Sequence, residues 1–376
     1  MAATAPLALV HDYLLVRRGA ERTFEAMAEC FPEAPIYTLL YDPDGSEGRY
    51  ADRKVHTSFL QRLGRKQSDF RQLLPAFPVA VRSLPLAGHR VVISSSSAFA
   101  HAVRVDRDAR HLCYCHSPFR YAWFEQRRAL TEVSPRLRPA LAATLAGVRA
   151  SDRAAAGRVD RYLANSRLTR RRVAAYWGRE SGIVNPPVEV IRFAPRTRGG
   201  GAPRRSLLVV GELVAHKRVD VALEAARRAD VPIVVVGEGP ERERLEARYR
   251  APGRAEFLGR VDDQELAGLY ASCLALVMTN TEEFGIVAVE AMAAGRPVLA
   301  AAAGGALETV VDGETGRLVP AGDVEALARA ITETDFDRFG QARIRAHAAR
   351  FSRDAFKRRL RAEVERMLAE PRRGVV

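Results

Sequence analysis

Residues 274–294 read LALVMTNTEEFGIVAVEAMAA, and their pattern indicates the architecture of the second half of the chain. The first five residues are all apolar, as in a strand buried on both faces of a parallel sheet. A polar loop follows at 279–283, and Phe284-Gly285 opens an apolar helix that we expect at 286–294. Glycine allows close backbone approach, and the first turn of a helix leaves amide N–H groups unpaired. The stretch therefore predicts an anion site suited to a phosphate.

Two carboxylates in this stretch are candidates for ligand binding. Glu282 lies in the loop, where a sugar hydroxyl could reach it. Glu290 lies in an otherwise apolar helix, where an unpaired carboxylate is costly. The hydroxyls of a ribose, or a buried arginine, would satisfy it. A pair of carboxylates can also hydrolyse glycosides, but the neighbouring anion site favours the binding of a sugar donor.

The alternation of strand and helix extends along the whole chain and predicts α/β domains with parallel sheets. A length of 376 residues suits two domains rather than one core. Further short, apolar runs typical of buried strands lie at 7–10, 91–94, 162–164, 207–211, 233–237 and 297–300. We expect an N-terminal domain at 1–187, a linker at 188–205, a second α/β domain at 206–352, and a C-terminal helix at 353–376.

The positive charge of the chain is concentrated in its first half. The formal net charge is +14; residues 1–188 hold 29 Lys and Arg against 17 Asp and Glu, and residues 189–376 hold 30 against 28. Such asymmetry suggests an anionic partner for the first half, and an ordinary solvated surface is the open alternative. Residues 59–88 mix basic and apolar side chains, among them Arg65, Lys66, Phe70 and Arg71. This stretch could contact an anionic membrane or pack in the core.

Neither a membrane span nor a metal site is expected from the sequence. No apolar run approaches the roughly 20 residues of a spanning helix, and the N-terminus lacks a signal pattern. We therefore expect a cytoplasmic protein, for which peripheral contact at the inner face of the membrane is an open alternative. The four cysteines, which lack metal-site spacing and read as small buried side chains, are Cys30, Cys113, Cys115 and Cys273.

EEFGIVAVE at 282–290 resembles the E-x7-E motif of family-4 retaining glycosyltransferases, which have the GT-B fold of two Rossmann-like domains with parallel sheets facing across a cleft. Several further motifs resemble the mannosyltransferase-like subgroup that builds surface polysaccharides. They are HDYL at 11–14, GAER at 19–22, YCHSPFRYAW at 114–123, ANS at 164–166, VGELVAHKRVD at 210–220, AMAAGRPV at 291–298, GGALE at 304–308 and VDGETG at 311–316.

The resemblance implies three catalytic residues. Lys217 would neutralise the diphosphate of the donor, where a fixed cation stabilises the charge that grows as the bond breaks. Glu282 would contact hydroxyls of the donor sugar, and His116 would lie near that sugar, although a lone histidine at a strand end is often structural. The implied donor-binding residues are Gly19, Arg218, Gly237, Val261, Phe284, Gly285, Ile286 and Glu290, with Glu290 on the ribose, and no residues are implied for a metal.

One departure from the family pattern concerns the phosphates. Glu212 stands where such enzymes usually have an arginine. An acid beside a diphosphate repels it, so that Arg18, Arg120 or Arg218 would have to supply the missing charge.

The function implied is retaining, metal-independent transfer of a hexose from a nucleoside-diphosphate sugar to a hydroxyl of a glycan or lipid-linked acceptor. The resemblance further implies that domain 1–187 is the acceptor side, that domain 206–352 binds the nucleotide sugar, and that the helix at 353–376 returns to the first domain. GDP-mannose or a UDP-sugar is the favoured donor, and no other cofactor is expected. A secondary-metabolite glycosyltransferase with a small soluble acceptor is one alternative, and a GT-B epimerase or phosphorylase is another. A basic nucleic-acid-binding protein would belong to a different class, but no recognised nucleic-acid module appears, so we expect no nucleic acid partner.

Overall fold

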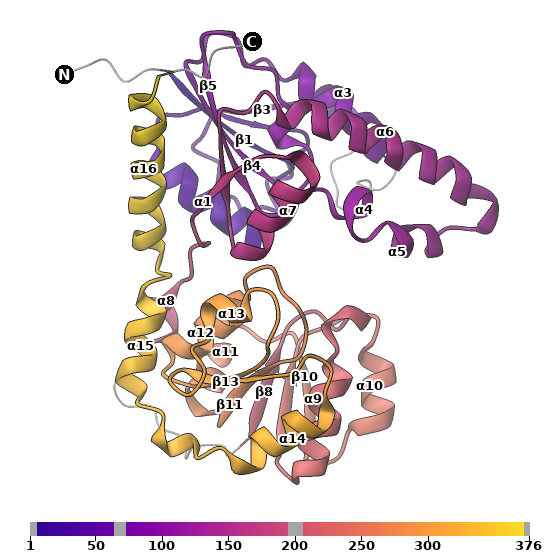
Figure 1. Cartoon of the computed structure of the whole chain (residues 1–376), viewed down its shortest axis with the longest axis vertical. Helices are drawn as coiled ribbons and strands as arrows, with labels where there is room; N and C mark the ends of the chain where they lie inside the picture. The colour runs from indigo at the N-terminus through magenta and orange to yellow at the C-terminus, as the bar shows by residue number, and fades with distance from the viewer. Residues whose placement is uncertain (1–5, 64–72, 195–205, 372–376) are drawn as a thin grey trace. The chain divides into compact units, whose positions relative to one another are not determined.

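The computed structural model describes residues 6–63, 73–194 and 206–371 (Figure 1). It divides the chain into two compact units. Unit 1 comprises residues 1–185 and 356–376, and unit 2 comprises residues 186–355. The prediction of two Rossmann-like α/β domains with parallel sheets is confirmed, because each unit is built on its own parallel sheet.

The sheet of unit 1 has seven strands in the described residues, in the order β3-β2-β1-β4-β5-β6-β7. Every neighbouring pair is parallel. The order reverses beside β1, so the loops after β1 and β4 meet at the carboxyl edge, where ligands of such sheets usually bind. The strands are β1 (Leu7–His11), β2 (Ile36–Thr38), β3 (Val55–Thr57), β4 (Val91–Ser96), β5 (Arg110–Cys115), β6 (Arg161–Ala164) and β7 (Ser181–Ile183).

Helices cover both faces of this sheet. Side chains on successive strand residues alternate between faces, so Leu9 packs in one cluster while Ala8 and Val10 pack in the other. The α-helices of the unit are α1 (Gly19–Cys30), α3 (Phe77–Ala80), α4 (Arg120–Trp123), α5 (Gln126–Thr131), α6 (Arg138–Ala156) and α7 (Arg167–Trp177). The short 3-10 helices are η1 (Phe59–Arg62), η3 (Leu74–Ala76), η4 (Val81–Ser83), η5 (Ala100–Ala102) and η6 (Pro135–Leu137).

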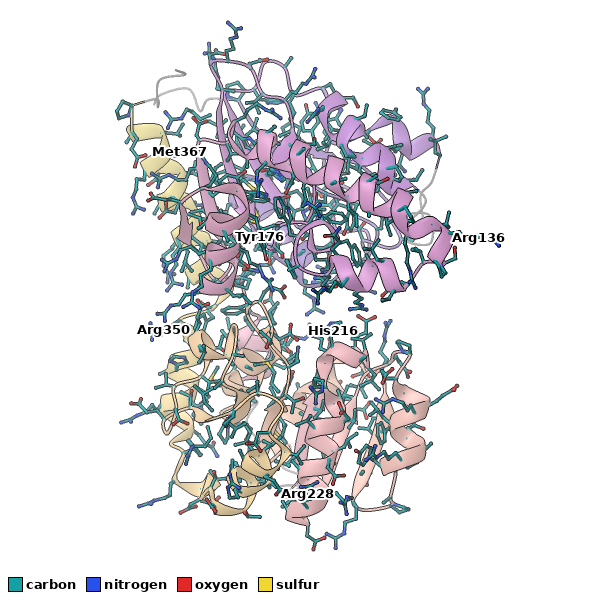
Figure 2. All side chains as sticks on the ribbon, turned by 45° about the vertical axis from the view of Figure 1, so that its right-hand side comes forward. Arg136, Tyr176, His216, Arg228, Arg350 and Met367 are labelled. Carbon is teal, nitrogen blue, oxygen red and sulfur yellow. The ribbon has the colours of Figure 1, made fainter. Side chains whose placement is uncertain are left out.

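The last helix, α16 (Arg353–Ala369), packs with α1 on one face of the unit 1 sheet (Figure 1). Its buried side chains recur at helical spacing: Phe356, Leu360, Val364 and Met367. Met367, labelled in Figure 2, is fully buried. Arg161 on β6 pairs with Glu363 of α16 at 2.7 Å, so both polar and apolar contacts hold the helix on the sheet.

The sheet of unit 2 has six strands among the described residues, in the order β10-β9-β8-β11-β12-β13, again parallel throughout. β8 and β11 are neighbours in the sheet, although 64 residues separate the end of β8 from the start of β11. The loops that follow these two strands therefore meet at the carboxyl edge of the sheet. The strands are β8 (Leu207–Val210), β9 (Ile233–Val236), β10 (Ala255–Gly259), β11 (Ala275–Met278), β12 (Val298–Ala301) and β13 (Gly316–Val319).

Two apolar clusters lie on opposite faces of this second sheet, one with α12 and α15 and the other with α9 and α14. The 3-10 helices of unit 2 are η7 (Ala215–Lys217) and η8 (Phe336–Arg338). Its α-helices are α8 (Val190–Phe193), α9 (Val219–Ala229), α10 (Arg242–Tyr249), α11 (Asp263–Ser272), α12 (Ile286–Ala293), α13 (Ala306–Thr309), α14 (Val324–Glu333) and α15 (Gln341–Ala349).

Two stretches singled out in the sequence lie partly outside the described residues. Of the basic stretch 59–88, Arg65, Lys66, Phe70 and Arg71 are not described, and its Phe77 is fully buried in the core. Of the predicted linker 188–205, residues 195–205 are not described, and α8 occupies the part before them. No helix in the described ranges is long and apolar enough to cross a membrane.

Candidate functional site

The backbone of Lys217 is held by a contact with the residue that follows the neighbouring strand β11. Lys217 is the last residue of η7, the turn that follows β8, and comes directly after His216, which is labelled in Figure 2. Thr279, the first residue after β11, donates its hydroxyl to the backbone carbonyls of Lys217 at 3.1 Å and Arg218 at 2.7 Å. Arg218 adopts a left-handed conformation with φ of +51°, which turns the chain into α9. The lysine is therefore held where β8 and β11 end.

The side chains of Lys217 and Glu282 form an ion pair. The ammonium donates to Glu282 Oε1, and the Asn280 amide donates to the same oxygen at 2.9 Å. The side chains are 25% and 21% exposed, so the pair is only partly screened by water. Burial alone would raise the pKa of the Glu282 carboxyl, but Lys217 and Asn280 outweigh it and hold the pKa below its ordinary value. Two implied catalytic residues, 65 positions apart, are thus in direct contact.

The start of α12 lies next to this pair. Gly285 precedes the helix with φ of +84°, a conformation that side chains disfavour, and a Cβ there would lie 3.1 Å from Met278 Sδ. Ile286 opens the helix, and the first-turn amides of a helix have no partner within it. Phe284 is buried, with its ring 5.4 Å from that of Phe351. The loop that carries Glu282, the partner of Lys217, therefore leads directly into the first turn of α12.

A pair of glycines, which the sequence reasoning did not assign to the site, fixes the loop before α12. The Gly305 N–H donates to the Glu282 carbonyl at 2.8 Å. A Cβ on Gly304 would lie 2.2 Å from that carbonyl oxygen, and one on Gly305 would lie 2.3 Å from Phe284 Cα. Only glycine allows this approach, so the GGALE motif acts by holding the Glu282 loop in place.

Glu290 has a hydrogen-bond partner that the sequence reasoning did not foresee. Its carboxylate is 6% exposed and accepts a hydrogen bond from the hydroxyl of Tyr270, on α11, at 2.9 Å. The sequence alone predicts ribose hydroxyls or a buried arginine as its partner. A tyrosine in an apolar core also supplies a donor, and Tyr270 is itself fully buried. Contact of Glu290 with a ribose stays a prediction.

The remaining predicted donor residues of unit 2 lie at strand ends. Gly237 follows β9 with φ of +138°, and a Cβ on it would lie 1.8 Å from the Gly211 carbonyl oxygen, so the loops after β8 and β9 touch through their backbones. Val261 follows β10 and is partly buried. Arg218 is half exposed and 3.6 Å from Asp220. Glu212, the unexpected acid, is exposed to solvent.

His116 belongs to unit 1, at the end of β5. Its Nε2 lies 2.8 Å from the hydroxyl of Ser95, and its backbone carbonyl accepts a hydrogen bond from Thr169 at 3.0 Å. Burial lowers the pKa of His116 to about 3, with a further contribution from His11. The imidazole is therefore neutral at physiological pH and can orient a hydroxyl but is a poor acid.

Gly19 is the first residue of α1 and is exposed. Its backbone lies outside the left-handed region in which glycine is favoured. The helix start is instead closed by Glu21, which accepts a hydrogen bond from the Arg18 N–H at 2.9 Å. A role for Gly19 in binding phosphates stays a prediction.

Asp12 has a clear local role that the HDYL motif did not reveal. Its buried carboxylate accepts hydrogen bonds from four successive backbone N–H groups, those of residues 97–100, at 2.5, 3.0, 2.7 and 2.6 Å. Those residues follow β4, so Asp12 at the end of β1 fixes the neighbouring loop at the carboxyl edge of the sheet. The loop follows β4, the strand that carries Ser95, the hydrogen-bond partner of His116.

No group of three or more His, Cys, Asp or Glu suited to a metal ion occurs in the described part of the chain. The four cysteines are free and buried. Burial raises the pKa of Cys273 to about 12, which leaves its thiol protonated and unreactive.

Comparison with known proteins identifies relatives of part of the chain. Residues 199–350 match the family model described as glycosyl transferases group 1. A GDP-mannose-dependent alpha-(1-6)-phosphatidylinositol monomannoside mannosyltransferase of Mycolicibacterium smegmatis is 33% identical over 192 residues, covering 44% of this chain and 50% of the relative. A D-inositol 3-phosphate glycosyltransferase of Geodermatophilus obscurus is 34% identical over 249 residues, covering 57% and 55%. The chain thus spans about half the length of these relatives.

Solved structures resemble the chain over nearly its whole length. Anabaena HepE in complex with UDP and glucose has a TM-score of 0.71 at 18% identity, covering 96% of this chain and 99% of that one. Sucrose-phosphate synthase of Thermosynechococcus elongatus has a TM-score of 0.72 at 20% identity, covering 97% and 99%. At these identities the likeness establishes the fold, which is that of GT-B glycosyltransferases.

Proposed function

We propose that the chain transfers a hexose from a nucleoside-diphosphate sugar to an acceptor hydroxyl with retention of configuration, a proposal supported by the match of residues 199–350 to the model described as glycosyl transferases group 1. The observation that carries the proposal is the contact between Lys217 and Glu282 beside the start of α12. This arrangement combines a fixed cation, the N–H groups that open a helix, and a carboxylate, which are the groups that a diphosphate and a sugar require.

Each group of this arrangement has a separate task in the proposed reaction. An ammonium has three protons, so Lys217 can keep its bond to Glu282 while donating to a phosphate oxygen. The amides that open α12 stabilise the same leaving group, whose negative charge grows as the glycosidic bond breaks. Glu282, ionised because its pKa is lowered, accepts hydrogen bonds from sugar hydroxyls. The attacking hydroxyl gives its proton to the departing phosphate.

GDP-mannose is the first donor to test and UDP-glucose the second. The mycobacterial relative is named as GDP-mannose-dependent, and the Anabaena structure holds UDP and glucose. A thermal-shift panel of GDP-, UDP-, dTDP- and ADP-sugars separates these donors, because a bound ligand raises the melting temperature by mass action. A donor at 100 times its Kd stabilises the fold by about 2.7 kcal/mol.

We propose a polyol, glycan or lipid-linked acceptor. The relatives are named for phosphatidylinositol monomannoside, which is a lipid, and for D-inositol 3-phosphate, which is small. The excess of basic residues in 1–188 suits either anionic acceptor and also peripheral contact with an anionic membrane. Release of nucleoside diphosphate in the presence of soluble inositol phosphate, compared with phosphatidylinositol in vesicles, decides between them.

Metal independence is part of the proposal because Lys217 and the α12 amides supply the positive charge that a divalent ion provides in other transferases. Turnover should therefore be unchanged by excess EDTA, and an activity abolished by EDTA and restored by a divalent ion would contradict this part. Proton NMR of the fresh product reads the configuration of the new bond, and an inverted product would exclude the retaining reaction.

The decisive variant is Lys217→Ala. Loss of a transition-state cation should lower turnover by at least about 100-fold. Lys357→Ala is the matched control, because Lys357 also pairs with a glutamate, Glu29, and is similarly exposed at 22%, but it lies on α16 in unit 1. Near-normal turnover in Lys217→Ala, or equal losses in both variants, would overturn the assignment.

A further inference from the structure

A hydroxyl between two buried imidazoles joins His116 to the first helix of unit 1. Ser95 Oγ lies 2.8 Å from His116 Nε2 and 3.0 Å from His11 Nδ1. The His11 ring is 2% exposed and stacks on Phe24 with centroids 4.7 Å apart. Its other nitrogen, Nε2, lies 3.8 Å from a carboxylate oxygen of Glu21. These contacts form a continuous polar path from α1 through β1 and β4 to the end of β5.

Counting protons limits how this path can be arranged. The Ser95 hydroxyl has one proton, so it can donate to only one of the two ring nitrogens and must accept from the other. A neutral imidazole likewise carries a proton on one nitrogen only. The tautomer of His11 therefore determines the direction of the Ser95 hydroxyl, and that direction determines the tautomer of His116.

Glu21 decides between the two directions. It lies in the first turn of α1, where the helix dipole favours negative charge, and its other oxygen accepts the Arg18 N–H at 2.9 Å. A carboxylate facing His11 Nε2 favours a proton on that nitrogen. His11 Nδ1 then accepts from Ser95, and Ser95 in turn accepts from the Nε2–H of His116.

The consequence appears on the opposite side of the His116 ring. Within the described residues Nδ1 of His116 has no hydrogen-bond partner, and the ring retains some exposure to solvent. With the proton fixed on Nε2, Nδ1 presents a lone pair. The low pKa of His116 agrees with a ring that stays neutral in this state.

We propose that Glu21, His11 and Ser95 are positioning residues that hold His116 in the tautomer protonated on Nε2, so that Nδ1 accepts a hydrogen bond from a hydroxyl of the substrate. The identity of that substrate rests on the proposed function, whereas the tautomer does not. A hydroxyl bound in this way donates to His116, which distinguishes it from a hydroxyl that accepts an N–H.

The experiment measures the tautomer directly, in the full chain without donor. Nitrogen-15 NMR of imidazole-labelled protein, with His116→Gln to assign the signals, should show a protonated Nε2 and a bare Nδ1 on His116. In Ser95→Ala the signals should move toward a mixture of tautomers, and Ser95→Thr, which keeps the hydroxyl, should restore the original pattern. The matched control is Ser94→Ala, which removes a similar buried contact, 2.8 Å to His111, on the same strand.

Glu21→Gln provides a second variant in case Ser95→Ala fails to fold. It keeps an acceptor for the Arg18 N–H but removes the charge facing His11, so the His116 signals should again become mixed. A proton on Nδ1 in the wild type, or a tautomer unchanged in both Ser95→Ala and Glu21→Gln, would overturn the proposal.

Measurements of kcat/KM then test the positioning role separately from the proposed transferase function. With the donor that turns over, Ser95→Ala should lower kcat/KM by about tenfold, the loss expected for one oriented hydrogen bond, and Ser94→Ala should not. A confirmed tautomer in a chain that turns over no nucleotide sugar would refute the proposed function alone. A normal kcat/KM in Ser95→Ala with an altered tautomer would refute the positioning role.

Discussion

Replacing Lys217 by methionine should destabilise unit 2 in a way that depends on pH. The change keeps the apolar stem but removes the ammonium, so that the Asn280 amide is left to donate a hydrogen bond to the Glu282 carboxylate. Breaking a fully buried pair costs about 3–5 kcal/mol, and an exposed pair contributes about 0–1 kcal/mol. Since these side chains are 25% and 21% exposed, we expect a loss of about 1–2 kcal/mol near neutral pH.

The direction of the pH dependence follows from the lowered pKa of Glu282. A carboxyl whose pKa is lower in the folded state stabilises the fold above its unfolded value, and this contribution disappears as the pH falls through the folded value. In Lys217→Met burial is no longer opposed by the ammonium, so the pKa of Glu282 should rise. The difference between variant and wild type should therefore shrink as the pH falls from the raised pKa of the variant to the lowered pKa of the wild type, and it should be smallest where both carboxyls are protonated.

The position of the tryptophans provides an internal control for the assay. Both tryptophans of the chain, Trp123 and Trp177, lie in unit 1, so their fluorescence follows that unit alone. Urea unfolding of unit 2 should be followed by hydrogen exchange in peptides from β8 and β11. A loss that appears equally in tryptophan fluorescence, or one that is the same at pH 7 and pH 4, would refute the reasoning, and so would a destabilisation by Lys357→Met confined to unit 2.

Three further predictions concern single contacts. Asp12→Ala leaves four amides, three of them in buried residues, without their acceptor. The change should destabilise unit 1 by about 4 kcal/mol, at about 1 kcal/mol for each bond, and should speed hydrogen exchange of those amides; unchanged exchange would contradict it. Gly285→Ala should lower the free energy of unfolding by about 1–2 kcal/mol and weaken donor binding, because both the backbone and Met278 oppose a side chain there. The control is Gly313→Ala, which is also at positive φ and should lower stability without changing the affinity for the donor. Equal donor affinity in the two variants argues against a site at α12. Tyr270→Phe removes a donor from buried Glu290 and should lower the melting temperature of unit 2, which calorimetry measures; an unchanged value would show that the bond contributes nothing.

The sequence predicted the fold class well because the strands are short, apolar and separated by helical patterns. The predicted strand 274–278 is β11 (Ala275–Met278), and the predicted helix 286–294 is α12 (Ile286–Ala293). Gly285 also stands at the predicted helix start with a positive φ. These features depend on local sequence, and local sequence is what periodicity and glycine placement report.

The contacts within the site could not be predicted in the same way. Lys217 and Glu282 were assigned separate roles, and nothing in their local sequence indicates that they pair, because the pairing depends on β8 and β11 being neighbours. The hydrogen bond that Tyr270 donates to Glu290 depends similarly on how α11 packs against α12. Side-chain partners distant in sequence follow from strand order and helix packing, which a single sequence does not specify.

The functional roles of the site residues remain predictions of the resemblance. The structure places Lys217, Glu282, Phe284, Gly285 and Ile286 at one edge of the unit 2 sheet. That clustering supports a donor site and gives each residue a contact that can be tested.

The most direct test of the central claim is calorimetric titration of the wild-type chain, Lys217→Ala and Lys357→Ala with GDP and UDP. The account predicts that at least one nucleoside diphosphate binds the wild type and Lys357→Ala equally and binds Lys217→Ala at least about tenfold more weakly, because a charge-assisted bond to the diphosphate has been lost. Equal affinity for Lys217→Ala, or no binding of either nucleotide to the wild type, would contradict the claim that Lys217 and the start of α12 hold the diphosphate.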